Sequence, residues 1–228
     1  MARASDPIAA PWHTAALIAL ILCVATTGTL LSRSGSLPQA ANGSDRLTAV
    51  YLPMLIVNSS LALYVCRIGR PRNALRSLLG EGWSRVGRAC ADVALGFVGW
   101  LLILAVEAAW VRLFGPHAGA AVLGALPRSA GERIAWVVVS VSVGFCEEIV
   151  YRGYLQTQLA AFTRRPAVAI ALQAALFGYA HADQGAGSAV RLALYGLALG
   201  ALAWWRRSRV AGIVCHVWTN IASGLLRR

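Results

Sequence analysis

The sequence has no lysine and few charged residues of either sign. Only 13% of its 228 residues are charged and only nine are acidic, whereas 58% are hydrophobic. The mean hydropathy is +0.62. About a quarter of the residues in a soluble globular domain are charged, because its surface must interact with water. This chain has too little polar surface to cover a water-soluble globule, which excludes the soluble globular classes.

The five cysteines form no CxxC pair. They are Cys23, Cys66, Cys90, Cys146 and Cys215, and each lies inside or at the end of an apolar run. Disulfide frameworks and zinc ribbons depend on characteristic cysteine spacings that do not occur here. The sequence therefore predicts buried thiols that fill apolar space, and neither a disulfide scaffold nor a zinc ribbon.

All 21 basic residues are arginines, and the formal net charge is +12. In a soluble protein such an excess would suggest nucleic-acid binding. Here the arginines fall between apolar runs, where basic residues set the topology of a membrane protein and contact anionic lipid headgroups. We therefore exclude nucleic acid as a partner and expect the lipid bilayer in its place.

Seven apolar segments are long enough to cross about 30 Å of hydrocarbon, which takes roughly 20 helical residues. They are Trp12–Leu31, Leu47–Cys66, Ala89–Phe114, Glu132–Phe162, Pro166–Ala182, Ser188–Trp205 and Val210–Leu226. The first is too long for the apolar core of a signal peptide, so we interpret it as an uncleaved anchor. The stretch from Ala118 to Leu126 is too short to span and is either re-entrant or interfacial. The sequence predicts an all-α, polytopic membrane helix bundle in one membrane domain, with about seven transmembrane helices and a range of six to eight.

The arginines are distributed unequally between the two sides of this bundle. The loops 67–88, 164–165 and 206–209 carry eleven arginines, and the loops on the opposite side carry five. Basic residues in short loops are retained on the cytoplasmic side. The distribution predicts a cytoplasmic N-terminus and an external C-terminus.

Two carboxylates lie in the third apolar segment. Arg88 precedes Asp92 by four residues, whereas Glu107 has no partner at helical spacing in its own segment. Ionisable side chains inside a membrane are costly and commonly pair across helices. We expect Asp92 and Glu107 either to pair with residues of other helices or to lie near the interface.

The fourth segment contains the sequence EEIVYR, from Glu147 to Arg152. Glu148 and Arg152 are four residues apart, so they share one helix face with the acid in the favourable N-terminal position. Glu147 projects about 100° away from Glu148 on an α-helix. The spacing predicts that the arginine neutralises Glu148 and leaves Glu147 facing elsewhere.

Two further segments carry histidine. The fifth ends with the sequence FGYAH, from Phe177 to His181, and the seventh contains HVWTN, from His216 to Asn220. His216 and Asn220 share a face at a spacing of four residues. Taken alone, His181 is consistent with a place at the membrane interface, and the second pair is consistent with hydrogen bonding between helices.

Together the three patterns resemble a known family. EExxxR, FxxxH and HxxxN occur in this order on three separate segments, as in the CPBP (CAAX protease and bacteriocin-processing, also called Abi) family of intramembrane glutamic endopeptidases. The resemblance covers roughly Ser140 to the C-terminus. All the motif positions are filled without substitution: Glu147, Glu148, Arg152, Phe177, His181, His216 and Asn220.

The resemblance implies a metal-free peptidase core at residues 131–228, preceded by family-variable spans at residues 1–130. Glu147 would activate water with the help of His181, and His216 and Asn220 would form an oxyanion hole. Arg152 and Glu148 would fix the helix and the local charge. The implied protein is an integral component of a bacterial plasma membrane and hydrolyses a peptide bond in a membrane-associated protein or peptide.

Three alternatives remain open from the residues themselves. Glu147, His181 and His216 could bind zinc, although the chain has no HExxH sequence. Cys146 or Cys215 could be a nucleophile, but an apolar helix offers no obvious means of activating a thiol. The third is a non-catalytic scaffold or bacteriocin self-immunity protein. No residue selects among a prenylated CAAX protein, a bacteriocin precursor and a C-terminal sorting signal as the substrate.

The arginine distribution generates a topological prediction. A reporter fused near Gly80, in the loop that carries six arginines, should read as cytoplasmic, because these charges resist translocation. Cysteine labelling from either side of the membrane measures the same property. An external signal near Gly80 would overturn the orientation, and a cytoplasmic C-terminus would mean that a span around Ala118 to Leu126 had been missed.

Overall fold

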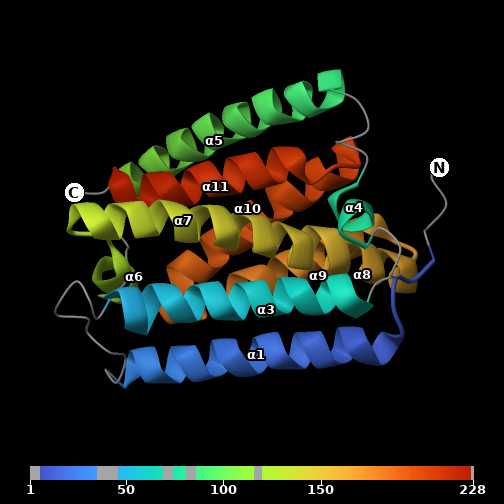
Figure 1. Ribbon diagram of the computed structural model, residues 1–228, viewed down its shortest axis with the longest axis horizontal. Helices are drawn as coiled ribbons and strands as arrows, with labels where there is room; N and C mark the ends of the chain where they lie inside the picture. Colours follow the sequence, from blue (N-terminus) through green and yellow to red (C-terminus); the bar gives the residue numbers. More distant parts are fainter. Residues whose placement is uncertain (1–5, 35–45, 69–73, 81–85, 116–119, 227–228) are drawn as a thin grey trace.

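The computed structural model describes residues 6–34, 46–68, 74–80, 86–115 and 120–226. Apart from one isolated bridge between Gly80 and Ser208, the regular structure of this part of the chain is helical (Figure 1). The helices are α1 (Pro11–Arg33), η1 (Leu47–Tyr51), α3 (Leu52–Ile68), α4 (Ala74–Leu79), α5 (Val86–Phe114), α6 (Ala120–Ala125), α7 (Ala130–Glu147), η3 (Glu148–Leu155), α8 (Gln156–Thr163), α9 (Pro166–Tyr179), η4 (Ala182–Gln184), α10 (Ala186–Arg206) and α11 (Val210–Leu225). The predicted all-α, polytopic bundle is confirmed.

Five of the expected spans are long and apolar enough to cross a membrane on their own. They are Pro11–Arg33, Leu47–Ile68, Val86–Leu113, Ala130–Thr163 and Ala186–Arg206. The other two, α9 and α11, have only 14 and 16 residues. At 1.5 Å per residue they are about 21 and 24 Å long, less than the thickness of the hydrocarbon. The predicted set of seven therefore consists of five full-length helices and two short ones.

The helices alternate in direction along the bundle. The start of α1 and the end of α11 lie at opposite ends of the long axis in Figure 1. The predicted fourth segment is one continuous helical rod of 34 residues, Ala130–Thr163, that begins as α7 and ends as α8. The helix α6 has six residues and is too short to span, as expected; residues 118 and 119 of that stretch lie outside the described residues.

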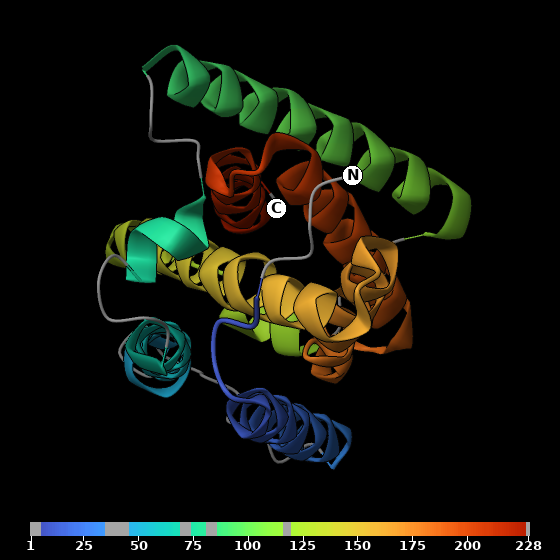
Figure 2. The same ribbon diagram turned by 90° about the vertical axis from the view of Figure 1, so that its right-hand side faces the viewer.

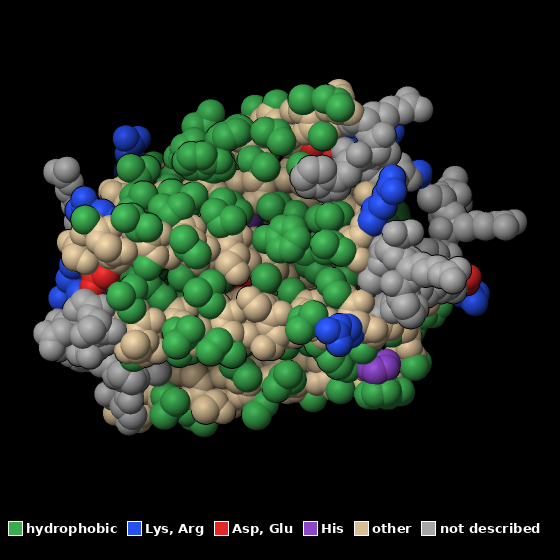
Figure 3. Space-filling model, in the orientation of Figure 1, with side chains coloured by type: hydrophobic (Ala, Val, Ile, Leu, Met, Phe, Trp, Pro, Cys, Tyr) green, Lys and Arg blue, Asp and Glu red, His purple; other side chains and the backbone are tan. Residues whose placement is uncertain are grey.

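The end-on view shows how the centre of the bundle is built. In Figure 2, α11 is enclosed between α5 and α7, and α10 and α9 lie side by side on the other flank. Figure 3 shows that hydrophobic side chains cover the long face of the molecule, while most of the charged ones lie towards its two ends. The short helix α11 therefore lies mainly among other helices, whereas α9 and the long helices also present apolar side chains to lipid.

Two ion pairs join α5 to α10. Asp92 accepts a hydrogen bond from Nε of Arg206 at 2.7 Å, and Glu107 pairs with Arg191. The two acids are 15 residues apart in the sequence, and so are the two arginines. The two contacts therefore lie about four helical turns apart along two antiparallel helices. The expected pairing of Asp92 and Glu107 across helices is confirmed.

The start of α7 is fixed by a capping box and an ion pair. Ser129 is the N-cap, its hydroxyl accepts from the backbone N–H of Glu132, and the Glu132 carboxylate accepts from the N–H of Ser129. The same carboxylate lies 2.9 Å from Nη2 of Arg46, and both side chains are buried. This pair connects the segment before α3 to the helix that carries the EExxxR motif.

Candidate active site

The two adjacent glutamates lie where α7 changes into the π-helix η3. All eight residues of η3, from Glu148 to Leu155, are buried. A π-helix has wider turns than an α-helix, and short π segments occur frequently at functional sites. A pattern read with α-helical periodicity did not predict this change. It alters the directions in which Glu147 and Glu148 point relative to the rest of the rod.

Glu148 and Arg152 form a fully buried ion pair, as their spacing predicted. Oε1 of Glu148 lies 2.8 Å from Nη1 of Arg152, and neither side chain is exposed. The guanidinium carbon also lies 4.5 Å from the centroid of the Phe177 ring, close enough for a cation–π interaction. The charge of Glu148 is therefore balanced within its own helix.

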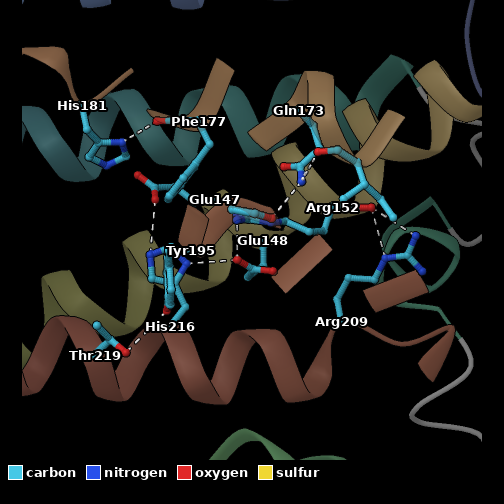
Figure 4. Close-up of polar contacts among 12 residues, drawn as sticks. Glu147, Glu148, Arg152, Gln173, Phe177, His181, Tyr195, Arg209, His216 and Thr219 are labelled. Carbon is cyan, nitrogen blue, oxygen red and sulfur yellow. Dashed lines mark hydrogen bonds and ion pairs between the residues drawn. The ribbon is translucent and has the colours of Figure 1, made fainter. Parts of the chain in front are cut away.

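His216 lies between the two carboxylates (Figure 4). Its Nδ1 is 3.1 Å from Oε1 of Glu148, and its Nε2 is 3.5 Å from Oε2 of Glu147. A protonated imidazole has two N–H donors, so one ring can serve both acids. Gly212, one turn before His216, permits this approach, because a Cβ there would lie 2.7 Å from Oε2 of Glu148.

Two aromatic rings hold the imidazole of His216 in place. Phe177 and Tyr195 meet it edge to face, with centroids 5.8 and 5.5 Å away and interplanar angles of 82° and 86°. This geometry is favourable for aromatic pairs and restricts rotation of the ring. The sequence placed Phe177 in a motif but did not indicate Tyr195, because it lies in α10, outside all three motifs.

His181 lies in the turn that follows α9. Its Nδ1 is 2.8 Å from the backbone oxygen of Phe177. In the neutral ring that nitrogen is the donor, so Nε2 has a free lone pair. Figure 4 shows the His181 ring beside the Glu147 carboxylate, whose side chain is 12% exposed. Three of the predicted residues, Glu147, His181 and His216, therefore gather at one place.

Asn220 is placed one turn beyond His216 in α11 but stays outside this network. Its backbone oxygen accepts a hydrogen bond of 2.9 Å from the indole of Trp136. Within the described chain, the side-chain amide of Asn220 forms no hydrogen bond, and the residue is only partly buried. Its N–H donors are thus free to bind a ligand.

Arg209 was expected only as a loop arginine, and the structure gives it a role at the site. Its guanidinium donates to the backbone oxygen of Arg152 at 3.3 and 3.2 Å and to Oγ1 of Thr157 at 3.0 Å. Burial lowers the pKa of Arg209 to about 10, so the side chain stays protonated at neutral pH. Its own backbone N–H donates to the oxygen of Leu79, the last residue of α4. Arg209 therefore ties η3 to the ends of α4 and α11.

No group of three His, Cys, Asp or Glu side chains is arranged to hold a metal ion in the part of the chain that the structure describes. This includes the three residues of the zinc alternative, Glu147, His181 and His216. The five cysteines are all free thiols, and Cys146 and Cys215 are buried.

The Glu148–Arg152 pair generates a stability prediction. Arg152→Ala should destabilise the protein by about 3–5 kcal/mol, because it leaves the Glu148 charge buried without a partner. The double variant Glu148→Gln/Arg152→Met should recover much of the melting temperature, since it removes both charges, but should stay inactive. A normal melting temperature for the single Arg152→Ala variant would show that the pair is not maintained.

Comparison with protein families found a similarity over the region that carries the site. A family model described as type II CAAX prenyl endopeptidase Rce1-like matches residues 129–222. No curated protein and no solved structure matches the chain. The matched region contains all three motifs and every residue of the network around His216. Over residues 129–222, this membrane protein is therefore similar to the CAAX prenyl endopeptidases of that family.

Proposed function

We propose that the protein is an intramembrane glutamic endopeptidase that cleaves a peptide bond in a membrane-associated protein or peptide. The observation that carries this proposal is the difference between the two adjacent carboxylates. Glu148 is fully buried and is paired with Arg152 at 2.8 Å. Glu147 is partly exposed, and its one ion-pair contact among the described residues is with His216, at 3.5 Å. A carboxylate that acts as a general base must be able to reach a water molecule and must not be held in a tight ion pair, and Glu147 fits these requirements better than Glu148.

In this mechanism Glu147 takes a proton from water as the water oxygen attacks the carbonyl carbon of the substrate. The free lone pair on Nε2 of His181 accepts the second hydrogen of the same water and orients it. The proton on Glu147 then passes to the leaving nitrogen as the peptide bond breaks. A positioned acid or base of this kind accelerates a reaction by about 10²–10⁴-fold.

His216 and Asn220 are the proposed donors to the developing oxyanion. The contact between His216 and Glu147 is long, and protonation of Glu147 removes the negative charge that favours it. Nε2–H of His216 then becomes available, next to the free amide of Asn220 one turn away. Glu148 keeps its hold on Nδ1, at 3.1 Å, so the ring stays oriented throughout.

The substrate class that we propose to test first is a prenylated protein with a C-terminal CAAX sequence, because that is the class named for the matching family. A bacteriocin precursor and a C-terminal sorting signal are the other candidates. We further propose that the protein resides in a bacterial plasma membrane. The arginine distribution supports an orientation with the N-terminus in the cytoplasm.

The assignment of the base is tested by Glu147→Gln. This variant should retain the wild-type fold and melting temperature, because Glu147 has no tight ion pair, but it should lose at least about 10²-fold in turnover of a prenylated CAAX peptide. Glu107→Gln is the matched control, since it removes another intramembrane carboxylate, and it should remain active. If Glu147→Gln kept a tenth of the wild-type turnover, another residue would have to be the base.

The metal-free mechanism is tested by chelation and by comparing the two histidines. Phenanthroline or EDTA should leave the activity of the purified protein unchanged, and its zinc content should stay well below one per chain. His181→Ala should be almost inactive, whereas His216→Ala should keep a measurable rate, because removing one of two oxyanion donors costs about 10²–10³-fold. The zinc alternative would be established if the active protein contained stoichiometric zinc, if chelation removed zinc and activity together, and if added zinc restored the activity. An equal loss of activity in His181→Ala and His216→Ala would point to the same alternative.

A further inference from the structure

Two buried glutamines lie behind the pair of carboxylates, and neither belongs to a motif. Gln156 in α8 and Gln173 in α9 are 3% and 0% exposed. Each donates its amide N–H to a backbone oxygen of α10 at 3.0 Å, Gln156 to Gly200 and Gln173 to Gly196. In the described part of the chain neither amide oxygen has a hydrogen-bond partner. Each glutamine is therefore anchored by its nitrogen and presents an unused acceptor.

The buried ion pair presents unused groups to the same region. Arg152 meets Glu148 through Nη1 and Oε1. Its Nε and Nη2, and Oε2 of Glu148, have no hydrogen-bond partner among the residues that are described. A guanidinium group has five N–H donors, so one carboxylate oxygen leaves most of them unsatisfied.

These groups form a polar layer that extends over about two helical turns in the interior of the bundle. Arg152 and Gln156 are one turn apart on the continuous rod, and Figure 4 shows Gln173 beside Arg152. At Gly200 a Cβ would lie 2.5 Å from Nε2 of Gln173 and 2.9 Å from Oε1 of Gln156. The two amides therefore converge on a glycine, and Gly212 gives Oε2 of Glu148 similar room at the other end.

Unsatisfied polar groups are unfavourable inside a bundle whose outer surface is hydrophobic. The layer contains both donors and acceptors, so its ligand must be able to donate and accept. An anion would be repelled by Glu148 and a cation by Arg152, while the pair itself is neutral overall. Water satisfies these conditions, and a buried water typically makes about three hydrogen bonds to such groups.

We propose that Arg152, Gln156, Gln173 and Oε2 of Glu148 form a binding site for ordered water. Gln156 and Gln173 are positioning residues in this site. Through the bound water they give Arg152 acceptors other than Glu148. Without them the guanidinium would take both oxygens of Glu148 and draw the carboxylate away from Nδ1 of His216. The water site itself is independent of the proposed function, but its effect on turnover rests on that function.

The direct test is a crystal structure of the wild-type protein grown from a lipidic mesophase, at a resolution that shows ordered solvent. We expect at least one solvent peak within hydrogen-bond distance of Arg152 and of an oxygen of Gln156 or Gln173. A direct hydrogen bond from Arg152 to both amide oxygens, or a layer without solvent density, would overturn the proposal. This test needs no substrate, so it stands even if the proposed function fails.

The kinetic test compares glutamines. Gln156→Met and Gln173→Met should each lower kcat at least tenfold with little change in KM, because they misplace His216 without touching the substrate. Gln158→Met is the control: its amide oxygen accepts from the backbone of Ile8 at 2.7 Å and its nitrogen donates to Ala9, so that variant should lose stability but keep kcat. Gln173→Asn leaves an amide and room for one more water, and it should recover part of the rate. If all three methionine variants lost only stability, the positioning role would be wrong.

A second comparison uses glycines of α10 and needs no activity. Gly200→Ala places a methyl group against both amides and should lower the melting temperature and remove the solvent density. Gly187→Ala, in the same helix, has no neighbour within 4 Å of the added Cβ and should change neither. Unaltered solvent and stability in Gly200→Ala would contradict the proposed location of the site.

Discussion

An ion pair without exposed surface, between Glu148 and Arg152, determines how the centre of this bundle is arranged. In a protein surrounded by lipid, two such charges are tolerated only if neighbouring groups complete their interactions. Each neighbouring helix contributes to this. The helix α9 contributes the ring of Phe177, and α11 contributes His216 and the space at Gly212. Both charges belong to the π-helical segment η3. Moving any of these helices would leave a charge in an apolar environment.

The same pair separates the two adjacent acids into different environments. The charge of Glu148 is balanced by Arg152 in the same helix, and the same carboxylate also contacts Nδ1 of His216. Glu147 has no arginine partner one turn away, and it shares the other nitrogen of the ring at a longer distance. A partly exposed carboxylate therefore lies next to a fully buried one, and the imidazole of His216 contacts both. This division is what the proposed mechanism requires.

The helices outside the motifs support this centre. The pair between Arg46 and Glu132 anchors the start of α7, and the two pairs between α5 and α10 hold α5 over α11. The helices α9 and α11 pack against longer helices, so they do not need to cross the full thickness of the hydrocarbon by themselves. Their shortness places the turn with His181 and the N-terminal turn of α11 close to the buried acids. Polar groups are thereby concentrated in the interior, where the proposed water site also lies.

The sequence by itself determined the membrane class, the helical segments, the pairing of Glu148 with Arg152 and the three motifs that mark the family. These properties depend on hydrophobicity and on spacing along one helix, which are local. Only the tertiary structure showed that His216 contacts both acids, that Tyr195 and Arg209 pack at the site, and that Gln156 and Gln173 both bind α10 next to Gly200. Each of these contacts joins different helices, so it depends on helix rotation and depth, which spacing within one segment does not specify. The π-helix was missed for a related reason: its wider turn is stabilised by contacts from outside, from Arg209 and from Leu78 beside Gly153, and no local pattern in the sequence requires it.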